Sequence, residues 1–234
     1  MAQFNHTFLL TILFLVSSIE YGSSIEPSLA TSPQNNTKTK TQTQTSTMTY
    51  IESSCEGTLY PDLCLRCLAK FANSKIDGPQ HLAHVALSVS LYKALNTRGY
   101  LLKVAKEIEA IKDHKDGSRV AYQTVLDCVK QITDSVDQLS QAIKELRRLN
   151  KRNSTTIDDD FLWHISNVET WVSTALTDAS YCVESFPGHR MSKRTAAIKV
   201  KAKNVAEVTS NALALFHRYA SKTRAAAATN AKKH

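Results

Sequence analysis

Apolar side chains recur at alternating three- and four-residue steps through residues 119–151, with no Gly or Pro between them. This spacing places them along one side of a single helix, which would be roughly 45 Å long at about 1.5 Å per residue. A helix with one apolar side buries that side against other helices, so the pattern predicts a helical bundle. The predicted seam consists of Tyr122, Val125, Val129, Ile132, Val136, Leu139, Ile143 and Leu146.

Residues 79–112 show a second helical spacing, and Asn96 and Gly99 interrupt its seam. Such an interruption marks a bend or a weak point of the helix. The segment 113–117 is predicted to be the turn into the long helix. The inward residues expected here are Leu82, Val85, Val89, Tyr92, Leu102, Ala105 and Ile108.

Two more helices are predicted after the long one, over residues 161–186 and about 190–219. Asp158 or Asp159 is a candidate cap for the first of them. Asn204 and Asn211 fall on the seam of the last helix, where a buried Asn fixes the register of packing. The inward residues are Leu162, Ile165, Val172, Leu176, Ala179 and Cys182, then Val200, Val208, Leu215 and Tyr219.

The N-terminal part of the chain divides into three segments. Residues 1–24 contain a nine-residue apolar run, too short to span a bilayer and followed by small residues, which predicts a secretory signal peptide. Residues 25–48 are rich in Thr, Ser, Gln and Asn, which predicts a disordered polar leader. Residues 49–78 form a predicted helical hairpin that breaks at Tyr60-Pro61, since Pro suits the first turn of a new helix.

The fold class that follows is all-α. Gly (6) and Pro (5) are scarce, and short connections between long helices favour antiparallel neighbours. We expect a folded domain at 49–220, in which an up-down-up-down four-helix bundle (79–220) carries the N-terminal helical hairpin. Residues 221–234 are expected to be a frayed basic tail.

The net charge and the predicted export together limit the classes of molecule that the protein is expected to bind. The net charge of +8 becomes +9 once residues 1–24 are removed, because Glu20 is their only charged side chain. A secreted protein of this charge favours acidic matrix or acidic protein surfaces, and export argues against nucleic acid. The sequons at Asn35 and Asn153 are candidate glycosylation sites in predicted loops.

No catalytic, metal or cofactor motif is found. There is no G-x-S-x-G, phosphate-binding Gly-rich loop or HExxH. His81 and His84 have no third ligand, and Cys64-x-x-Cys67 has no second ligand pair. Acidic residues 158–160 are better explained as a helix N-terminus. We therefore predict a protein that is not an enzyme and needs no cofactor or metal.

Five cysteines in an exported chain indicate two disulfides and one spare thiol, although spacing alone leaves several pairings open. Four segments then resemble the plant invertase and pectin methylesterase inhibitor family. They are the stretch from Cys55 to Cys64, the triplet Leu126-Asp127-Cys128, the stretch from Val168 through Trp171 and Asp178 to Cys182, and residues 209–215. The resemblance spans about residues 50–219, in order, and the last two segments are similar to the pectin methylesterase inhibitor branch.

This resemblance implies an inhibitor domain with disulfides Cys55–Cys64 and Cys128–Cys182, leaving Cys67 as a free thiol. It also implies a monomer that packs over the esterase active-site cleft, mainly through the second and third bundle helices. A complex of that kind buries about 800 Å² per partner. Candidate contact residues off the seam of the long helix are Gln123, Thr124, Gln131, Thr133, Asp134, Gln138 and Gln141.

Other functions remain open. An invertase inhibitor has the same fold, but those proteins commonly carry Pro-Lys-Phe in the turn that here reads NKRNSTTIDDDF. A pro-region-like fragment of a pectinesterase and a non-inhibitory wall-binding protein are further possibilities. The basic residues Lys144, Arg147, Arg148, Lys151 and Arg152 could attract acidic pectin. The main prediction is a secreted, apoplastic inhibitor of pectin methylesterase without a membrane anchor.

Overall fold

The computed structural model describes residues 36–74, 76–110, 116–151, 159–186 and 191–231. Within these ranges every regular element is a helix, which confirms the all-α prediction. Several predicted features lie outside the described residues. They are the signal peptide, residues 113–115 of the predicted turn, and Asn35, Arg152, Asn153 and Asp158. None of the described helices is long and apolar enough to cross a bilayer.

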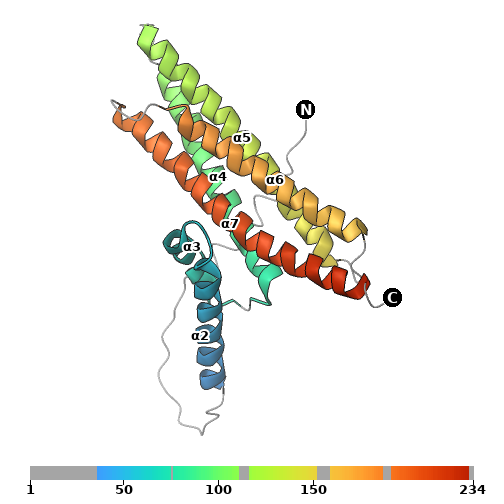
Figure 1. The fold of residues 1–234 in the computed structure, drawn as a ribbon. Helices are drawn as coiled ribbons and strands as arrows, with labels where there is room; N and C mark the ends of the chain where they lie inside the picture. The colour runs from blue at the N-terminus through green and yellow to red at the C-terminus, as the bar shows by residue number, and fades with distance from the viewer. Residues whose placement is uncertain (1–35, 75, 111–115, 152–158, 187–190, 232–234) are drawn as a thin grey trace, which may run out of the picture. The chain divides into compact units, whose positions relative to one another are not determined.

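The helices comprise a short N-terminal pair and four long ones (Figure 1). The pair consists of α2 (Asn36–Cys55) and α3 (Pro61–Leu68), and a 3₁₀ turn, η1 (Ala69–Phe71), follows α3. The long helices are α4 (Pro79–Ala110), α5 (Asp116–Lys151), α6 (Asp159–Glu184) and α7 (Lys193–Ala231).

The four long helices pack in a ring, in which α4 contacts α5, α5 contacts α6, α6 contacts α7 and α7 returns to α4. Cross-links show that neighbours run antiparallel. On α5 and α6, Ser135 bonds to the carbonyl of Ala175 and Cys128 is joined to Cys182, so a lower number on one helix meets a higher number on the other. The predicted four-helix bundle is confirmed.

Helix starts follow local chemistry. Pro61 begins α3 at a first-turn position and Asp62 adds a favourable charge there. Gly78, directly before α4, has φ of 101°, a left-handed backbone that favours glycine. Asp159, one of the two candidate caps, is the first residue of α6. Ser192 caps α7, because its Oγ accepts the backbone N–H of Thr195 at 3.1 Å.

The core confirms the α5 seam. Six of its eight residues are buried and the other two, Tyr122 and Val129, are partly buried against the core. A seam that is continuous from Tyr122 to Leu146, about seven turns of helix, gives α5 a long apolar side. The buried six are Val125, Ile132, Val136, Leu139, Ile143 and Leu146.

Three predicted inward residues are wrong. Tyr92 and Leu102 on α4 and Val200 on α7 are 57%, 51% and 67% exposed. Leu101 on α4 and Ile198 on α7 are buried instead. Successive residues are turned by about 100° around a helix, so Leu102 and Val200 point away from the core when these two face it. Asn96 and Gly99 do not break α4, which is helical throughout.

Two segments expected to lack structure are helical. The second half of the predicted leader, residues 36–48, belongs to α2, and residues 221–231 of the predicted frayed tail belong to α7. Extending a helix from a packed end requires no new nucleus, and the alanines of the tail have the highest helix propensity. Arg224 also holds this end of α7, since its guanidinium pairs with Glu169 of α6 at 2.5 Å.

The N-terminal hairpin is fastened to α7 through its turn. Asn211, 3% exposed, accepts the N–H of Tyr60 at 3.0 Å and donates to the carbonyl of Tyr60 at 2.9 Å. Arg218 donates to the carbonyl of Ser54 at 2.7 Å. A Cβ on Gly57 would lie 1.6 Å from Nη2 of this guanidinium, so a larger residue would displace it. Asn211 thus fixes register, as its seam position predicted.

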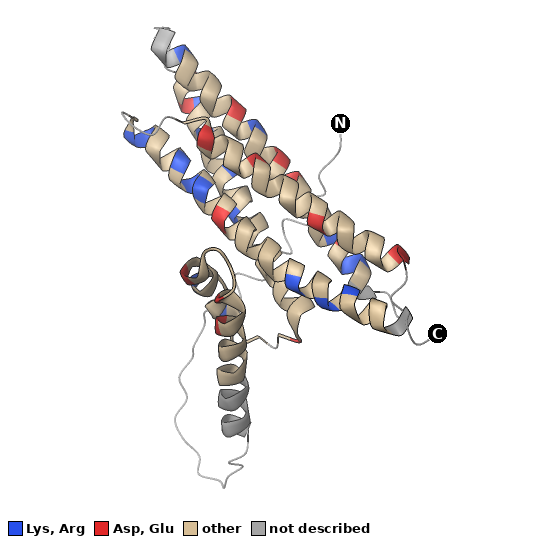
Figure 2. Cartoon of the chain, viewed as in Figure 1, with Lys and Arg blue, Asp and Glu red and all other residues tan. Residues whose placement is uncertain are grey.

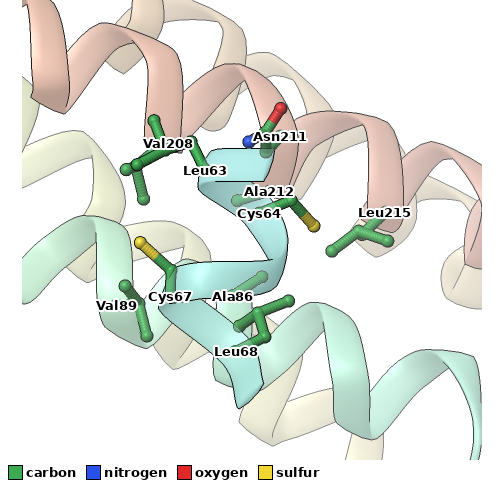
Figure 3. A pocket seen from close by; sticks show the side chains of 10 residues that line it. All are labelled: Leu63, Cys64, Cys67, Leu68, Ala86, Val89, Val208, Asn211, Ala212 and Leu215. Carbon is green, nitrogen blue, oxygen red and sulfur yellow. The ribbon is translucent and has the colours of Figure 1, made fainter. Parts of the chain in front are cut away.

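Both disulfides expected from the resemblance are present, Cys55–Cys64 and Cys128–Cys182, and Cys67 is free. Cys64 and Cys67 help line a cavity of about 10 Å³ where α3 covers α4 and α7, and their sulfur atoms point apart (Figure 3). The remaining walls are apolar apart from Asn211. A space of this size and polarity holds no ligand, so half-buried Cys67 acts as a small apolar side chain.

Candidate functional site

Residues spaced seven apart mark the side of α5 that faces α6. Residues seven apart lie on nearly the same side of a helix. Glu145 contacts His164 of α6. Gln138 and Gln131 precede Glu145 by seven and fourteen positions, and Thr124 continues the row. These residues therefore form a polar row along the α5–α6 edge.

Three buried acceptor atoms on this edge have no hydrogen-bond partner within the described part of the chain. They are Oε1 of Gln131, Oε1 of Gln138 and Oδ2 of Asp178, the last from α6. An unsatisfied buried acceptor costs about 1–3 kcal/mol. Three such atoms on one edge of the bundle are costly to the free protein. Because the three side chains are only half-buried, a side-chain rotation would turn these oxygens outward, where hydrogen-bond donors from a partner could satisfy them. We call Gln131, Gln138 and Asp178 the acceptor row.

Charges beside the acceptor row make it electronegative. Burial, followed by the negative charge of Asp134, raises the pKa of Asp178 above 3.8, and the positive charge of Lys130 opposes this rise. Lys130 itself pairs with Asp134 at 2.6 Å. The hydrogen bond and charge of Asp134 raise the pKa of Lys130. A partner that offers N–H or O–H donors fits this surface better than one that offers acceptors.

Charged side chains pair with one another at one end of the α5–α6 edge. The Glu145 side chain is 3% exposed, and it contacts His164 and pairs with Arg148 at 2.9 Å. Nε2 of His164 lies 3.6 Å from Asp160. Each carboxylate here has a basic partner. This cluster therefore ties α5 to α6 and leaves the acceptor row as the unpaired part of the edge.

The outward surface of α6 is aromatic at its ends and hydroxyl-bearing between them. Trp163 and Tyr181 are 59% and 55% exposed. Between them runs an open depression of about 430 Å³. Thr170, Thr174 and Thr177 each donate to the carbonyl four residues earlier, so their oxygens remain able to accept. The depression is lined by Glu169, Thr170, Ser173, Thr174 and Thr177.

The structure brings together only part of the predicted contact set. Gln131, Asp134 and Gln138 lie at or beside the acceptor row. Gln123 and Gln141 are exposed, and Gln123 donates to Asp127 at 3.0 Å. Thr124 continues the polar row, with its hydroxyl bonded to the carbonyl of Val120.

Thr133 belongs to the other side of α5. It precedes Arg147 by fourteen positions, and Nε of Arg147 donates to His84 of α4 at 3.3 Å. Asp178, Trp163 and Tyr181 were not among the predicted contacts. Asp178 lies within the motif that carries the family resemblance, so that motif was the one signal for it.

Among the described residues, no three His, Cys, Asp or Glu side chains gather in a way that could hold a metal ion. Nδ1 of His81 accepts the N–H of Asp77 at 3.3 Å. Burial, and then the charges of Arg147 and His81, lower the pKa of His84. A neutral His84 can accept the hydrogen bond from Arg147, which links α4 to α5.

The basic cluster predicted near the end of α5 is partly engaged within the protein. Arg147 donates to His84 and Arg148 pairs with buried Glu145. Lys144 is exposed. The side chain of Lys151 and all of Arg152 lie outside the described residues. The α5 end therefore offers less positive charge than its sequence suggests.

Comparison with known proteins assigns this architecture to a family. The model of the plant invertase/pectin methylesterase inhibitor family matches residues 49–215. Pectinesterase inhibitor 9 of Arabidopsis thaliana is 35% identical, over 94% of this chain and 97% of its own. Pectinesterase inhibitor 11 of the same species is 33% identical over 75% and 82%, and a 21 kDa protein of Daucus carota is 34% identical over 74% and 84%.

The fold has a solved counterpart. A crystal structure titled as mutant form A of a pectin methylesterase inhibitor from Arabidopsis covers 73% of this chain and 95% of that chain, with a TM-score of 0.52 at 22% identity. That likeness concerns the fold alone. Together with the sequence match over residues 49–215, it completes the assignment: the chain belongs to the plant invertase/pectin methylesterase inhibitor family.

Proposed function

We propose that this chain is a secreted inhibitor of pectin methylesterase that acts by binding, one inhibitor to one enzyme, with its α5–α6 edge over the active-site cleft. The observation that carries the proposal is the acceptor row, whose three buried oxygens lack partners in the described chain. Relatives named pectinesterase inhibitors, at 33–35% identity, supply the identity of the enzyme.

The acceptor row suits tight and selective binding. The row lies on two helices joined by a disulfide, so little backbone freedom is lost when a partner binds. Donors on the enzyme would satisfy each acceptor, whereas a surface without them would leave the acceptors unpaired. Exposed Trp163 and Tyr181 belong to the residue types that dominate interface energies, and they flank the edge on α6.

The test is a titration of the oxidised, full chain against purified pectin methylesterase, with an invertase assayed in parallel. We expect saturating inhibition at one equivalent and relief by excess pectin substrate, because substrate and inhibitor compete for the cleft. Absence of inhibition of any pectin methylesterase at micromolar inhibitor would refute the proposal. Inhibition of invertase alone would assign the chain to the other function of its family.

Matched variants locate the contact. Gln131→Ala and Gln138→Ala should each weaken inhibition by about tenfold, the loss expected for a central interface residue. Gln80→Ala, on α4, is the control and should inhibit normally. An equal loss in all three variants would show that the acceptor row is not the contact.

A further inference from the structure

A second polar surface lies on the α4–α7 edge and has the opposite chemistry. Five exposed cations gather there, and we call them the basic edge. Figure 2 shows the blue segments along the N-terminal half of α7. The carboxylate of Glu107 on this edge pairs with Arg194 at 3.5 Å. The basic edge consists of Lys103 and Lys106 of α4 and Lys193, Arg194 and Lys201 of α7.

Contacts between the helices place these cations on one surface. Arg194 reaches Glu107, and Nζ of Lys201 lies 4.8 Å from the ring centre of Tyr100. Tyr100, Lys103 and Glu107 follow the spacing i, i+3, i+7, so they share one side of α4. Lys103 therefore lies on the same side of α4 as two residues that both touch α7. Glu109 points about 200° away from Glu107 around the helix and lies closer to Lys106, three positions before it.

The positive charge at the start of α7 does not stabilise this helix. Lys193 and Arg194 occupy the first turn of this helix, which contains no acidic residue. The helix macrodipole disfavours cations at that end by about 0.3–1 kcal/mol. Residues that oppose local stability often mark a surface kept for binding. Here the opposed charge points to an anionic ligand.

The side chains of the basic edge indicate which kind of anion it would bind. Four of its five cations are lysines, which are depleted in the cores of protein interfaces, and no unpaired buried polar atom lies among them. Lysine ammonium groups act as hydrated point charges. Lys193 and Lys201 are separated by about 12 Å along the axis of α7, and Lys103 and Lys106 continue along α4. This arrangement fits repeated single charges on a flexible linear chain.

We propose that the basic edge binds an acidic polysaccharide, a chain of uronic acid residues whose carboxylates meet the lysines. The half-buried ring of Tyr100 holds the Lys201 ammonium over its face, which keeps this charge on the α4–α7 edge. In the ring of helices the α4–α7 edge lies opposite the α5–α6 edge. The polysaccharide and a protein on the acceptor row can therefore be bound at the same time. This inference does not depend on the proposed inhibition.

The test measures binding of the oxidised, full chain to polygalacturonate and to fully methyl-esterified pectin at low salt. We expect binding to the first only, since the second has no carboxylates. The variant Lys103→Gln/Lys193→Gln/Lys201→Gln should bind polygalacturonate at least about tenfold more weakly, because three ion pairs are lost. Its control, Arg66→Gln/Lys70→Gln/Lys222→Gln, has the same net charge and alters exposed cations elsewhere. The control should bind like the unaltered protein.

Three results would overturn the inference. Equal loss in both triple variants would show that net charge alone is responsible. Equal binding to methyl-esterified pectin would exclude the carboxylate contact. Tighter binding to a single-stranded oligonucleotide of matched charge would assign the surface to nucleic acid. Esterase inhibition by the lysine triple variant should be normal, so failure of the polysaccharide site is distinguishable from failure of the inhibitory one.

Discussion

The α5–α6 edge and the α4–α7 edge are both polar, yet they differ in how their polar atoms are held. The acceptor row consists of buried oxygens fixed between two cross-linked helices. The basic edge consists of exposed side chains, of which Arg194 pairs with Glu107 and Lys201 lies over the ring of Tyr100. A polar surface thus gains selectivity when its atoms are buried and rigidly held, whereas exposed charges attract a ligand from a distance without selecting its shape.

The largest effect is expected where the acceptor row is cross-linked. Cys128→Ser/Cys182→Ser opens a disulfide with a sequence separation of 54 and should lower the free energy of unfolding by about 4 kcal/mol. Inhibition should fall as well, because α5 and α6 lose their fixed register. Urea denaturation and an esterase assay measure the two effects.

The matched control is Cys55→Ser/Cys64→Ser, with a separation of 9 and an expected loss of about 3 kcal/mol. This bond joins α2 to α3, remote from the acceptor row, so the folded variant should still inhibit. If both variants lose inhibition equally, the contrast between a rigid edge and the rest of the bundle fails.

Asn211→Ala should have the next largest effect. It removes both hydrogen bonds to the backbone of Tyr60 and leaves two polar groups without their partner, at about 2 kcal/mol. Asn204→Ala, one heptad earlier on α7, is the control and should change the free energy of unfolding by less than about 0.5 kcal/mol. Polygalacturonate binding should persist in both. Loss of that binding in Asn211→Ala would mean that the basic edge depends on the hairpin.

A smaller effect of opposite sign is expected for Asp178→Asn. Since the folded-state pKa of Asp178 is raised, ionisation opposes folding: the favourable contribution is complete below pH 3.8 and is lost as pH rises through the folded pKa. The variant should therefore be more stable at pH 7 by less than about 1 kcal/mol, with the difference shrinking in acid. Inhibition should weaken.

Asp127→Asn is the control for that variant, because Asp127 is exposed and has Gln123 as a partner. Its stability should be within about 0.5 kcal/mol of the unaltered protein at both pH values. A more stable Asp178→Asn that inhibits normally would contradict the role of the acceptor row.

The smallest effect on stability is expected at the basic edge. Lys201→Gln removes one exposed cation over the ring of Tyr100 and should lower the free energy of unfolding by about 0.5 kcal/mol. Retention on polygalacturonate should nevertheless decrease. Raising the salt concentration to about 0.5 M should abolish retention and leave inhibition largely intact, because screening acts on exposed charge. Equal salt sensitivity of both activities would remove the distinction between the two edges.

The sequence predicted α5 well because its large apolar residues, such as Ile132 and Leu139, follow the buried side without a break. It predicted α4 and α7 in part, since Leu82 and Leu215 are buried as expected while Tyr92 and Val200 are exposed. Periodicity alone does not decide which apolar residues of a largely apolar helix meet its neighbours. Helix existence and most buried positions were therefore predictable, and the exposed apolar residues were not.

The candidate site was only partly accessible to sequence reasoning. Gln131 and Gln138 could be placed off the seam of α5 by periodicity, but their burial depends on how closely α6 approaches. Asp178 comes from another helix, 47 positions beyond Gln131 in the chain, and no local pattern links them. Unsatisfied acceptors arise from tertiary packing, so they become visible only when both helices are in place.

The ring order of the helices also bears on how the chain folds. Three of the four long contacts join helices consecutive in sequence, and only the α4–α7 contact joins the two ends of the bundle. Low contact order favours rapid folding. During synthesis the α5–α6 hairpin can pack, and Cys128 can be oxidised with Cys182, before α7 has emerged. The last helix, α7, then packs against a preformed layer of three helices and completes the ring. The basic edge, which needs both α4 and α7, is therefore assembled last.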